Sequence, residues 1–331
     1  MTERTGLGPL ELAVLRSVFA TAGSSGAHCR TTTTLDHLEA VEGIGPAYGL
    51  SVLQDLGSSW RVHLPLLDLE GNWGSIAGDP MAGPQYTEVM LSPIGELVLA
   101  CEEHRVGSVP IGLVDGGLYR GGKQPPLDPA RALRTIEALL EDETIPDGDL
   151  ERMIGLPSLP TGGTVQGDIQ GLYAGQDARL LQSCRITREL APPLPALVIT
   201  GTPLGVPTDQ IEPNLRERAQ AEKMMEQRRL GNDPGQGFPP EWLDWPHALP
   251  SPIGLRDVRD ETSGRTGTRL VIVAGADADL ETLERWVRGV WPVTIETSCR
   301  FPGGIGVVLR TWASLCRVDR SGLDKLAALM S

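Results

Sequence analysis

Membrane-directed segments are missing from this 331-residue sequence. No apolar run reaches the roughly 18 residues of a candidate membrane span. No N-terminal stretch joins basic residues to an apolar segment, as a signal peptide would. The sequence therefore predicts no membrane partner, and we expect a folded protein of the cytoplasm.

Cysteine is scarce and shows no pairing pattern. The chain has 5 cysteines, none of them in a CxxC pair. An odd number of scattered cysteines fits neither a disulfide framework nor a zinc site. The 5 histidines show no metal-ligand spacing either. We expect reduced, mostly buried thiols, with no metal and no cofactor bound by this chain.

Basic residues are also fewer than acidic residues. Lys and Arg number 29 against 43 Asp and Glu, which gives a net charge of −14 at pH 7. Nearly all of the bases are Arg, because Lys occurs only at positions 123, 223 and 325. A protein that holds DNA neutralises phosphates with Lys and Arg. Taken alone, the charge argues against strong DNA binding.

Glycine and proline are abundant while aromatic residues are few. The chain has 40 Gly and 27 Pro, against an aromatic content of 4%, which predicts many turns and short elements. Apolar residues at helical spacing predict helices over 9–23, 34–41 and 48–56. Short extended runs and a Gly-rich loop follow, and a further helix is predicted over 87–104. Helix, turn, helix, helix is the outline of a winged helix-turn-helix domain.

The pattern changes near residue 105, where we place a domain boundary. Beyond it, apolar spacing predicts helices at 130–141, near 211–230 and at 278–289. Apolar runs predict strands at 196–201, 269–275 and 304–310. The segment 231–252 has no period and predicts a surface loop. The expected fold class is α+β, with domains at 1–105 and 106–314 and a short C-terminal helix at 315–331.

The Gly-rich loop carries the most specific pattern in the sequence. Residues 71–88 read GNWGSIAGDPMAGPQYTE. Over this whole length, without a gap, the segment resembles the tyrosine loop of the A subunits of bacterial type IIA DNA topoisomerases, DNA gyrase and topoisomerase IV. Trp73 stands where the family has a Phe. Ten positions carry the family's own residues: Gly71, Asn72, Gly74, Ser75, Ile76, Gly78, Asp79, Tyr86, Thr87 and Glu88.

This resemblance implies that Tyr86 is a catalytic nucleophile. The phenol would attack a DNA phosphorus, form a 5′-phosphotyrosine linkage and release a 3′ hydroxyl, so that the break can be resealed. The partners that the resemblance implies are DNA and a gyrase B-type subunit, and it allows a homodimer. It assigns ATP and Mg²⁺ to the B-type subunit rather than to this chain.

The sequence departs from the family beside the tyrosine. Gln85 replaces the Arg that normally precedes it, and the family's histidine pair is missing from GIGPAYG at 43–49. A free tyrosine has a pKa of about 10, so its ionisation needs a cation or a base. The family's second helix places bases against phosphates, whereas residues 31–57 contain four acids and no Lys or Arg. Arg30 is the basic residue left beside this segment.

A serine and an aspartate on the third predicted helix also match the family. Gly49, Ser51 and Asp55 reproduce a Gly-x-Ser-x-x-x-Asp spacing that in gyrases lies beside the cleaved DNA. The spacing of four residues places Ser51 and Asp55 on one helix face. An ordinary helix surface is the alternative interpretation.

Two further segments extend the resemblance from about residue 6 to 310. Residues 109–140 resemble the stretch that bends DNA with an intercalating Ile, for which Leu118 or Tyr119 is the candidate substitute. Arg120 and Lys123 in this stretch are candidate phosphate contacts, with solvated loop charges as the alternative. Residues 254–273 resemble part of the family's tower, so the domain at 106–314 is expected to be tower-like.

Functions of different classes stay open at this point. The first is an A-subunit-like protein that breaks and rejoins DNA through Tyr86, as part of an ATP-hydrolysing type II DNA topoisomerase with a B-type partner. The second is a catalytically impaired paralogue that binds DNA or gyrase and modulates the active enzyme. A third is a DNA-binding regulator that uses only the winged helix. We expect neither the family's coiled-coil gate nor its C-terminal β-propeller-like domain in these residues.

Overall fold

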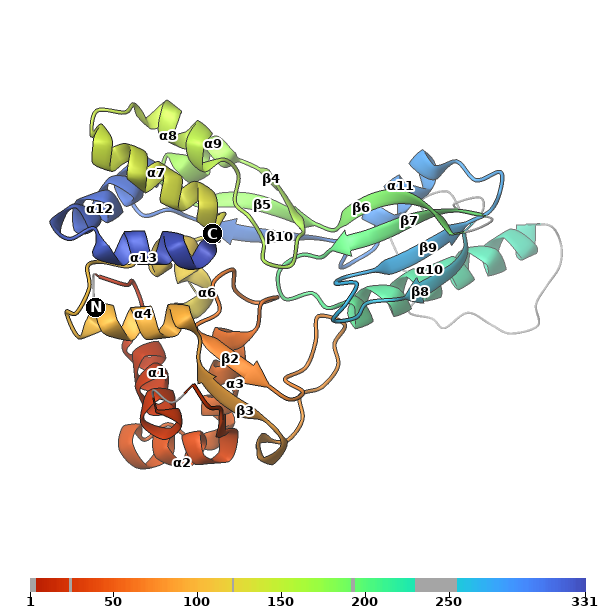
Figure 1. Cartoon of the computed structure of the whole chain (residues 1–331). Helices are drawn as coiled ribbons and strands as arrows, with labels where there is room; N and C mark the ends of the chain where they lie inside the picture. The colour runs from red at the N-terminus through yellow and green to blue at the C-terminus, as the bar shows by residue number, and fades with distance from the viewer. Residues whose placement is uncertain (1–3, 24–25, 121, 192–193, 230–254) are drawn as a thin grey trace.

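Three short helices open the fold, each ended by a glycine or just after one. The computed structural model describes residues 4–23, 26–120, 122–191, 194–229 and 255–331 (Figure 1). Helices α1 (Pro9–Ala22), α2 (Thr31–Glu42) and α3 (Pro46–Gly57) confirm the three predicted helices. Gly43 ends α2 in the left-handed conformation, with a φ of +68°, which costs a residue without a Cβ little.

A small antiparallel sheet packs against these helices. Its strands are β1 (Cys29–Arg30), β2 (Leu67–Glu70) and β3 (Glu88–Leu91), in the order β1-β3-β2. The helix predicted over 87–104 is therefore wrong in its first part, and α4 (Pro93–Glu102) begins only after Ser92. The residue before a proline avoids the helical region, and the Ser92 side chain accepts the N–H of Gly95 to cap the helix.

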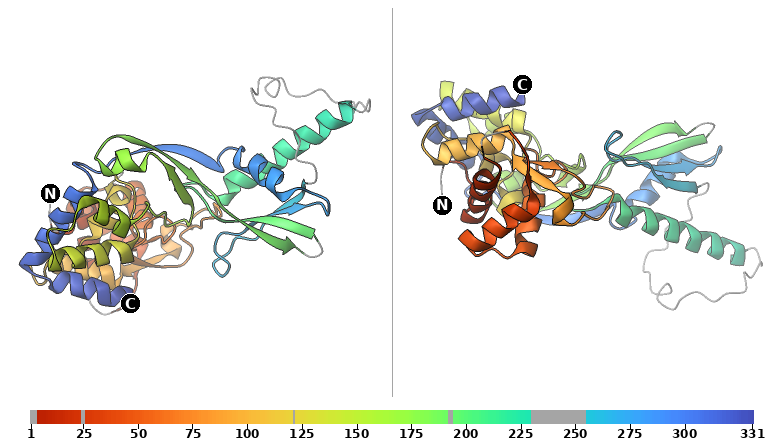
Figure 2. Two further views of the ribbon diagram at one scale, coloured as in Figure 1. Left: turned by 90° about the horizontal axis from the view of Figure 1, so that it is seen from above. Right: turned by 60° about the horizontal axis from the view of Figure 1, so that its bottom comes forward.

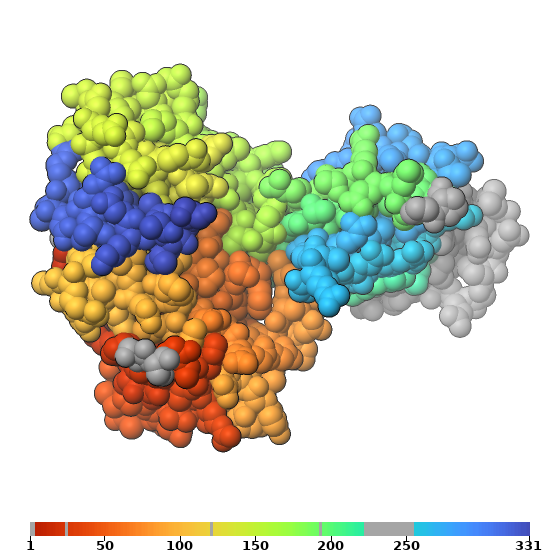
Figure 3. Space-filling view, in the orientation of Figure 1, coloured from red at the N-terminus to blue at the C-terminus, as the bar shows by residue number. Residues whose placement is uncertain are grey.

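The middle and the end of the chain add a second group of helices. They are α5 (Ile111–Val114), α6 (Gly116–Arg120), α7 (Pro129–Glu141), α8 (Asp147–Ile154), α9 (Ile169–Tyr173), α12 (Ile305–Val318) and α13 (Ser321–Met330). Helix α7 confirms the helix predicted at 130–141. Helices α12 and α13 lie between α4 and α7, as the space-filling view shows (Figure 3). One core cluster joins residues from Leu7 to Leu326.

Residues 304–310 are helical, so the strand predicted there is wrong. Ile305, Leu309, Trp312 and Cys316 are buried at intervals of four, three and four residues along α12. A short apolar run does not separate a strand from a buried helix, and the helical spacing emerges only when residues beyond 310 are included. The predicted short C-terminal helix is also incomplete, because α12 and α13 are separate helices that together cover residues 305–330.

Two further antiparallel sheets lead away from the helices. The first contains β4 (Thr164–Gly167), β5 (Ala178–Ser183) and β10 (Thr294–Cys299), in the order β10-β5-β4. The second contains β6 (Arg185–Ala191), β7 (Leu194–Gly201), β8 (Leu255–Asp260) and β9 (Leu270–Ala274), in the order β6-β7-β9-β8. Strands β7 and β9 confirm the predicted strands at 196–201 and 269–275.

Helices α10 (Thr208–Arg229) and α11 (Leu280–Arg288) pack on the four-stranded sheet and confirm the two helices predicted there. Their apolar side chains form a separate core with Leu197, Ile199 and Ile272. We call this sheet with its two helices the second lobe, and the remainder the first lobe. Figure 2 shows the second lobe extending away from the helices of the first. The surface loop predicted at 231–252 lies outside the described residues.

The expected α+β class is confirmed by these mixed helices and antiparallel sheets. Within the described ranges, no helix is both long and apolar enough to cross a bilayer. All five cysteines are free thiols, and four of them are buried, while Cys29 is partly exposed. The prediction of mostly buried thiols is thus confirmed.

Thiol reactivity tests this distribution of cysteines. Burial raises the pKa of Cys101 to about 11 and the pKa of Cys184 and Cys316 to about 12. Because the thiolate is the reactive form, these thiols stay protonated at pH 8. We expect one cysteine, Cys29, to react with a disulfide reagent in the native protein, and all five to react after unfolding. Cys29→Ser should remove the fast reaction, and fast labelling of two or more sites would contradict the fold.

Candidate functional site

Tyr86 stands at the end of the loop between β2 and β3. Residues Pro84–Tyr86 form a short 3-10 helix, η1, in which the Tyr86 N–H donates to the Gly83 carbonyl at 2.9 Å. The Tyr86 residue is 74% exposed. A phenol held this far into solvent on an ordered turn is accessible to a large substrate.

The loop before Tyr86, residues 71–86, is shaped by glycines and internal hydrogen bonds. We call it the tyrosine loop. Gly71 has a φ of +94°, and a Cβ there would lie 2.8 Å from the Tyr86 carbonyl oxygen. The Ala82 N–H donates to the Asn72 carbonyl at 2.9 Å, which closes the loop across its base. Trp73 is buried, and its indole N–H donates to the Glu70 carbonyl at 3.0 Å.

Helix α2 begins directly beside Tyr86. The Thr31 N–H donates to the Thr87 carbonyl at 3.0 Å, and the Thr87 hydroxyl donates to the Thr31 hydroxyl at 2.8 Å. Both residues are buried. The N-terminus of a helix carries a partial positive charge and amides that lack intrahelical partners. The turn that holds Tyr86 is thus fixed to a helix end that favours anions.

Arg30 is brought close to Tyr86 by the same strand pairing. It precedes α2 and lies opposite Glu88 in the β1-β3 register. Arg30 is exposed, and its guanidinium has no hydrogen-bond or ion-pair partner among the described residues. Gln85 supplies no charge, and its amide lies against Gly83, where a Cβ would come within 2.7 Å of Oε1. Arg30 is therefore the candidate cation for this turn.

Carboxylates share the exposed face of the sheet with this cation. Glu88 on β3 is the cross-strand neighbour of Arg30, and Glu70 on β2 is the next residue along the same row, paired with Glu88. His28 lies between Asp68 and Glu70, with its ring nitrogens 3.6 and 3.3 Å from their oxygens. The exposed face of the sheet is thus acidic on balance, which opposes a DNA phosphate.

Ser51 and Asp55 lie on α3, as the sequence predicted, but only Asp55 has a described partner. Asp55 pairs with Arg61, and Ser51 is exposed. Between them in the chain, the Gln54 amide donates to the Trp73 carbonyl at 2.5 Å and ties α3 to the tyrosine loop. A groove of about 470 Å³ follows this contact. Its polar lining includes Gln54, Asp55, Arg61, Ser75, Asp79 and Gln210.

Lys123 is not brought to Tyr86 by any described contact. Its ammonium pairs with Asp177 at 3.1 Å, beside Arg300 at 3.9 Å from the same carboxylate. Arg120 ends α6, and its side chain lies outside the part of the chain that the structure describes. Tyr119 is buried and its hydroxyl donates to the Leu64 carbonyl at 2.7 Å. The interpretation of Tyr119 as a wedge is therefore wrong, because it is already packed inside the protein.

The sequence did not predict a buried hydrogen-bonded network around Asp115. Asp115 is fully buried, and its carboxylate accepts the Leu64 N–H at 2.9 Å and the His63 Nδ1–H at 3.1 Å. His63 Nε2 lies 3.3 Å from the Ser158 hydroxyl. Burial, with the nearby Asp115 charge, raises the pKa of Tyr119 well above its usual value. The network fixes α6 to the segment that follows α3.

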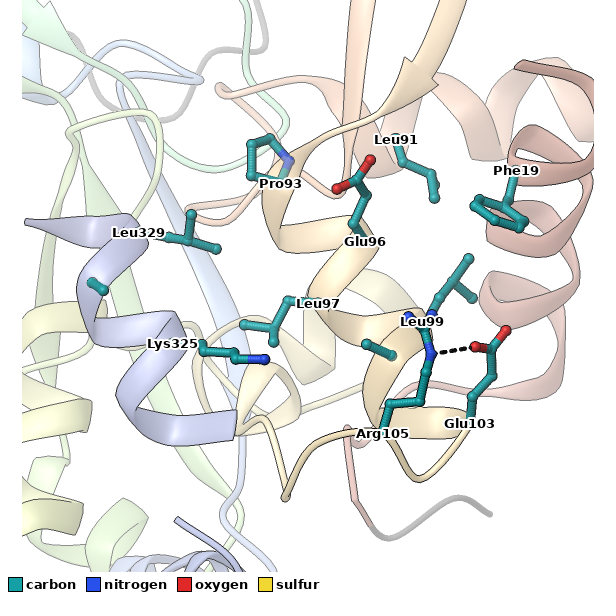
Figure 4. A pocket seen from close by; sticks show the side chains of 12 residues that line it. Phe19, Leu91, Pro93, Glu96, Leu97, Leu99, Glu103, Arg105, Lys325 and Leu329 are labelled. Atoms are coloured by element: carbon teal, nitrogen blue, oxygen red, sulfur yellow. Dashed lines mark hydrogen bonds and ion pairs between the residues drawn. The ribbon is translucent and has the colours of Figure 1, made fainter. Parts of the chain in front are cut away.

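A second groove is separate from the tyrosine loop. It occupies about 570 Å³ between α1, α4 and α13 and is lined mainly by apolar side chains such as Phe19, Leu97 and Leu329 (Figure 4). An ion pair between Glu103 and Arg105 stands at its rim, at 2.7 Å. No residue of the tyrosine loop lines this groove. In the described part of the chain, no cluster of three or more His, Cys, Asp or Glu side chains suits a metal ion.

Sequence comparison finds relatives among the subunits of bacterial DNA gyrase and DNA topoisomerase 4. The chain is a divergent relative of the A subunits of DNA gyrase and topoisomerase IV. The A subunit of DNA gyrase from Streptomyces coelicolor is 27% identical over 252 residues, which cover 67% of this chain and 26% of that protein. The A subunit of DNA topoisomerase 4 from Staphylococcus epidermidis is 23% identical over 312 residues, covering 86% and 35%.

A third relative gives the same picture. The A subunit of DNA topoisomerase 4 from Bacillus subtilis is 26% identical over 249 residues, covering 68% of this chain and 27% of that protein. The chain thus spans about a quarter to a third of the length of these curated relatives. No protein-family model matches the chain.

The buried network yields a stability prediction. Asp115→Ala leaves the Leu64 N–H and the His63 ring without an acceptor, so we expect a loss of about 3 kcal/mol in the free energy of unfolding. Asp115→Asn keeps an acceptor for Leu64 and should cost clearly less. Urea titration followed by circular dichroism measures both variants. Equal losses for the two would show that the carboxylate has no special role.

Proposed function

We propose that this chain is an A-subunit-like part of a type II DNA topoisomerase, in which Tyr86 breaks and rejoins DNA together with a B-type subunit. The observation that carries this proposal is the exposed tyrosine at the end of a glycine-shaped loop, fixed to the N-terminus of α2. The proposed winged-helix unit consists of α1 to α3 with β1 to β3, within residues 1–105. The proposed tower-like unit follows at 106–314.

The proposed reaction conserves the energy of the broken bond. The Tyr86 phenolate attacks a DNA phosphorus, the bond from phosphorus to the 3′ oxygen breaks, and that oxygen takes up a proton. The 5′-phosphate is then held on Tyr86, and the 3′ hydroxyl reverses the step. Arg30 would stabilise the phenolate and the charge on the phosphoryl oxygens, in place of the Arg that Gln85 replaces.

The remaining sequence-derived contacts fit this proposal to different degrees. Ser51 is exposed on α3 and free to meet DNA. Lys123 would exchange its ion pair with Asp177 for a phosphate, and Arg120 stays a proposed phosphate contact. ATP and Mg²⁺ would belong to the B-type subunit. The proposal allows a homodimer, and the proposed location is the cytoplasm, where the DNA is.

Acidic surface beside Tyr86 supports an alternative. Glu88 pairs with Arg30 across the strands, Glu70 lies beyond Glu88 in the same row, and Gln85 is neutral. An impaired A-subunit-like paralogue that binds DNA or gyrase without cutting needs no positive charge beside Tyr86. The two carboxylates and the neutral Gln85 are therefore compatible with that function. Cleavage activity separates the two functions.

A cleavage trap tests the proposal directly. We expect the chain, mixed with a B-type subunit, Mg²⁺ and labelled supercoiled DNA and quenched with detergent, to give protein-linked DNA. Tyr86→Phe lacks the nucleophilic oxygen and should abolish the linkage. No linkage with the wild-type chain, while a full-length A subunit cleaves beside it, would leave the modulator as the function.

Arg30 and Gln85 give a second, graded prediction. Arg30→Ala should lower cleavage by about 10- to 100-fold, because one cation beside the phosphoryl oxygens is lost. Gln85→Arg should raise cleavage by restoring a positive charge. Arg256→Ala is the matched control, since Arg256 is an exposed arginine on β8 of the second lobe. The role of Arg30 is refuted when both alanine variants cleave equally well.

A further inference from the structure

The tyrosine loop touches the second lobe at the first turn of α10. The Thr208 N–H donates to the Ile76 carbonyl at 3.1 Å, and the Asp209 N–H donates to the Ala77 carbonyl at 3.1 Å. Figure 1 shows the loop between β2 and β3 reaching the start of this helix. The first four N–H groups of a helix have no intrahelical partner. The tyrosine loop supplies two of the missing acceptors, so it caps α10.

The helix end that receives the loop is firmly held by its own lobe. Thr208 is fully buried, and its hydroxyl donates to an oxygen of Asp260, at the end of β8, at 2.5 Å. Ile211 and Leu215, on the next turns of α10, are fully buried in the second core. A displacement of the second lobe would therefore carry the first turn of α10 with it.

The loop is built to present those two carbonyls. The Ser75 hydroxyl donates to Asp79 at 2.5 Å and accepts the Ala77 N–H at 3.1 Å, which braces the turn. Gly78 has a φ of +98°, and a Cβ there would lie 2.1 Å from the Asp209 carboxyl carbon. This conformation favours glycine, and a Cβ there would have to displace the Asp209 carboxylate.

A short path connects the contact to the tyrosine. From Ala77 the chain turns through Gly78 to Ala82, whose N–H is bonded to Asn72, and reaches Tyr86 of the η1 turn four residues later. We propose that Thr208 and Asp209 are positioning residues for Tyr86: the second lobe fixes the tyrosine loop through them and so sets where the phenol stands. This inference rests on the proposed function of Tyr86 as a nucleophile.

Thr208→Pro and Thr208→Val form a matched pair of variants for the test. Proline is favoured at the first helical position and lacks the N–H, so Thr208→Pro deletes the bond to Ile76 and keeps the helix. Thr208→Val keeps that N–H, and both variants lose the hydroxyl bond to Asp260. Gly78→Ala disturbs the contact between the tyrosine loop and α10 by a change in the loop. Its control is Gly43→Ala, at a glycine with a φ of +68° and no atom near its Cβ position.

Two measurements on the full chain test whether α10 holds the tyrosine loop and positions Tyr86. Hydrogen exchange reports whether the amides of Ala82 and Tyr86 open, and trapped cleavage with a B-type subunit reports whether the phenol is in place. For Thr208→Pro, relative to Thr208→Val, we expect exchange at these amides to be about 10-fold faster. Exchange in the β6-β7-β9-β8 sheet should stay the same. Cleavage should fall by about 10-fold, since small misplacements of reacting groups slow reactions strongly.

Three other outcomes would contradict the positioning role of Thr208 and Asp209. They also distinguish its failure from a failure of the proposed function. Unchanged loop exchange in both Thr208→Pro and Gly78→Ala would show that α10 does not hold the loop. Faster loop exchange with undiminished cleavage would show that the contact does not position Tyr86. A wild-type chain that never cleaves would overturn the proposed function, and the positioning role with it, even where exchange responds as expected.

Discussion

Two helix N-termini meet the tyrosine loop and the residue that follows it, and the arrangement of the protein around Tyr86 depends on this sharing. The Thr31 amide of α2 is bonded to Thr87, and the first amides of α10 are bonded to Ile76 and Ala77. Buried amides without acceptors are strongly unfavourable. The loop between the strands is therefore part of the packing of both lobes, and Gly71, Gly74 and Gly78 give it the positive φ angles of its turns.

The negative charges near Tyr86 oppose the binding of a DNA phosphate, although the backbone geometry there favours it. The turn of Tyr86 adjoins a helix end suited to anions and an arginine without a described partner. Glu88 pairs with this arginine and Glu70 pairs with Glu88, in a chain with a net charge of −14. Screening by salt weakens the long-range repulsion more than the close contacts. A DNA-bound state of this chain would thus depend on short-range interactions near Tyr86 and on charge supplied by a partner.

The sequence predicted the elements whose apolar spacing is long and regular. Helices α1, α7 and α11 were found because several buried side chains recur at helical intervals in each. Residues 304–310 were assigned wrongly, because a run of seven residues lacks a period of its own. The start of the helix predicted over 87–104 failed because Pro93 restricts Ser92, so the strand before it could not continue into the helix.

The candidate site was predictable only in part. Tyr86 was singled out by the ungapped resemblance of residues 71–88 to the family's tyrosine loop, and the structure leaves it exposed. The hydrogen bonds of the Asp115 network and of the cap on α10 join residues that are separated by 51 to 132 positions in the chain. A local sequence pattern does not predict such pairs. Tyr119 was misread for the same reason, since its partner Leu64 is 55 residues away. Such long-range hydrogen bonds can be identified only in the folded structure.

Mass spectrometry of the trapped complex would identify the residue that is bonded to DNA. After cleavage with Mg²⁺ and a B-type subunit, detergent quenching and nuclease digestion, we expect the peptide containing Tyr86 to carry a 5′-linked nucleotide. An unmodified Tyr86 peptide, beside a full-length A subunit whose own tyrosine is modified in the same reaction, would contradict it.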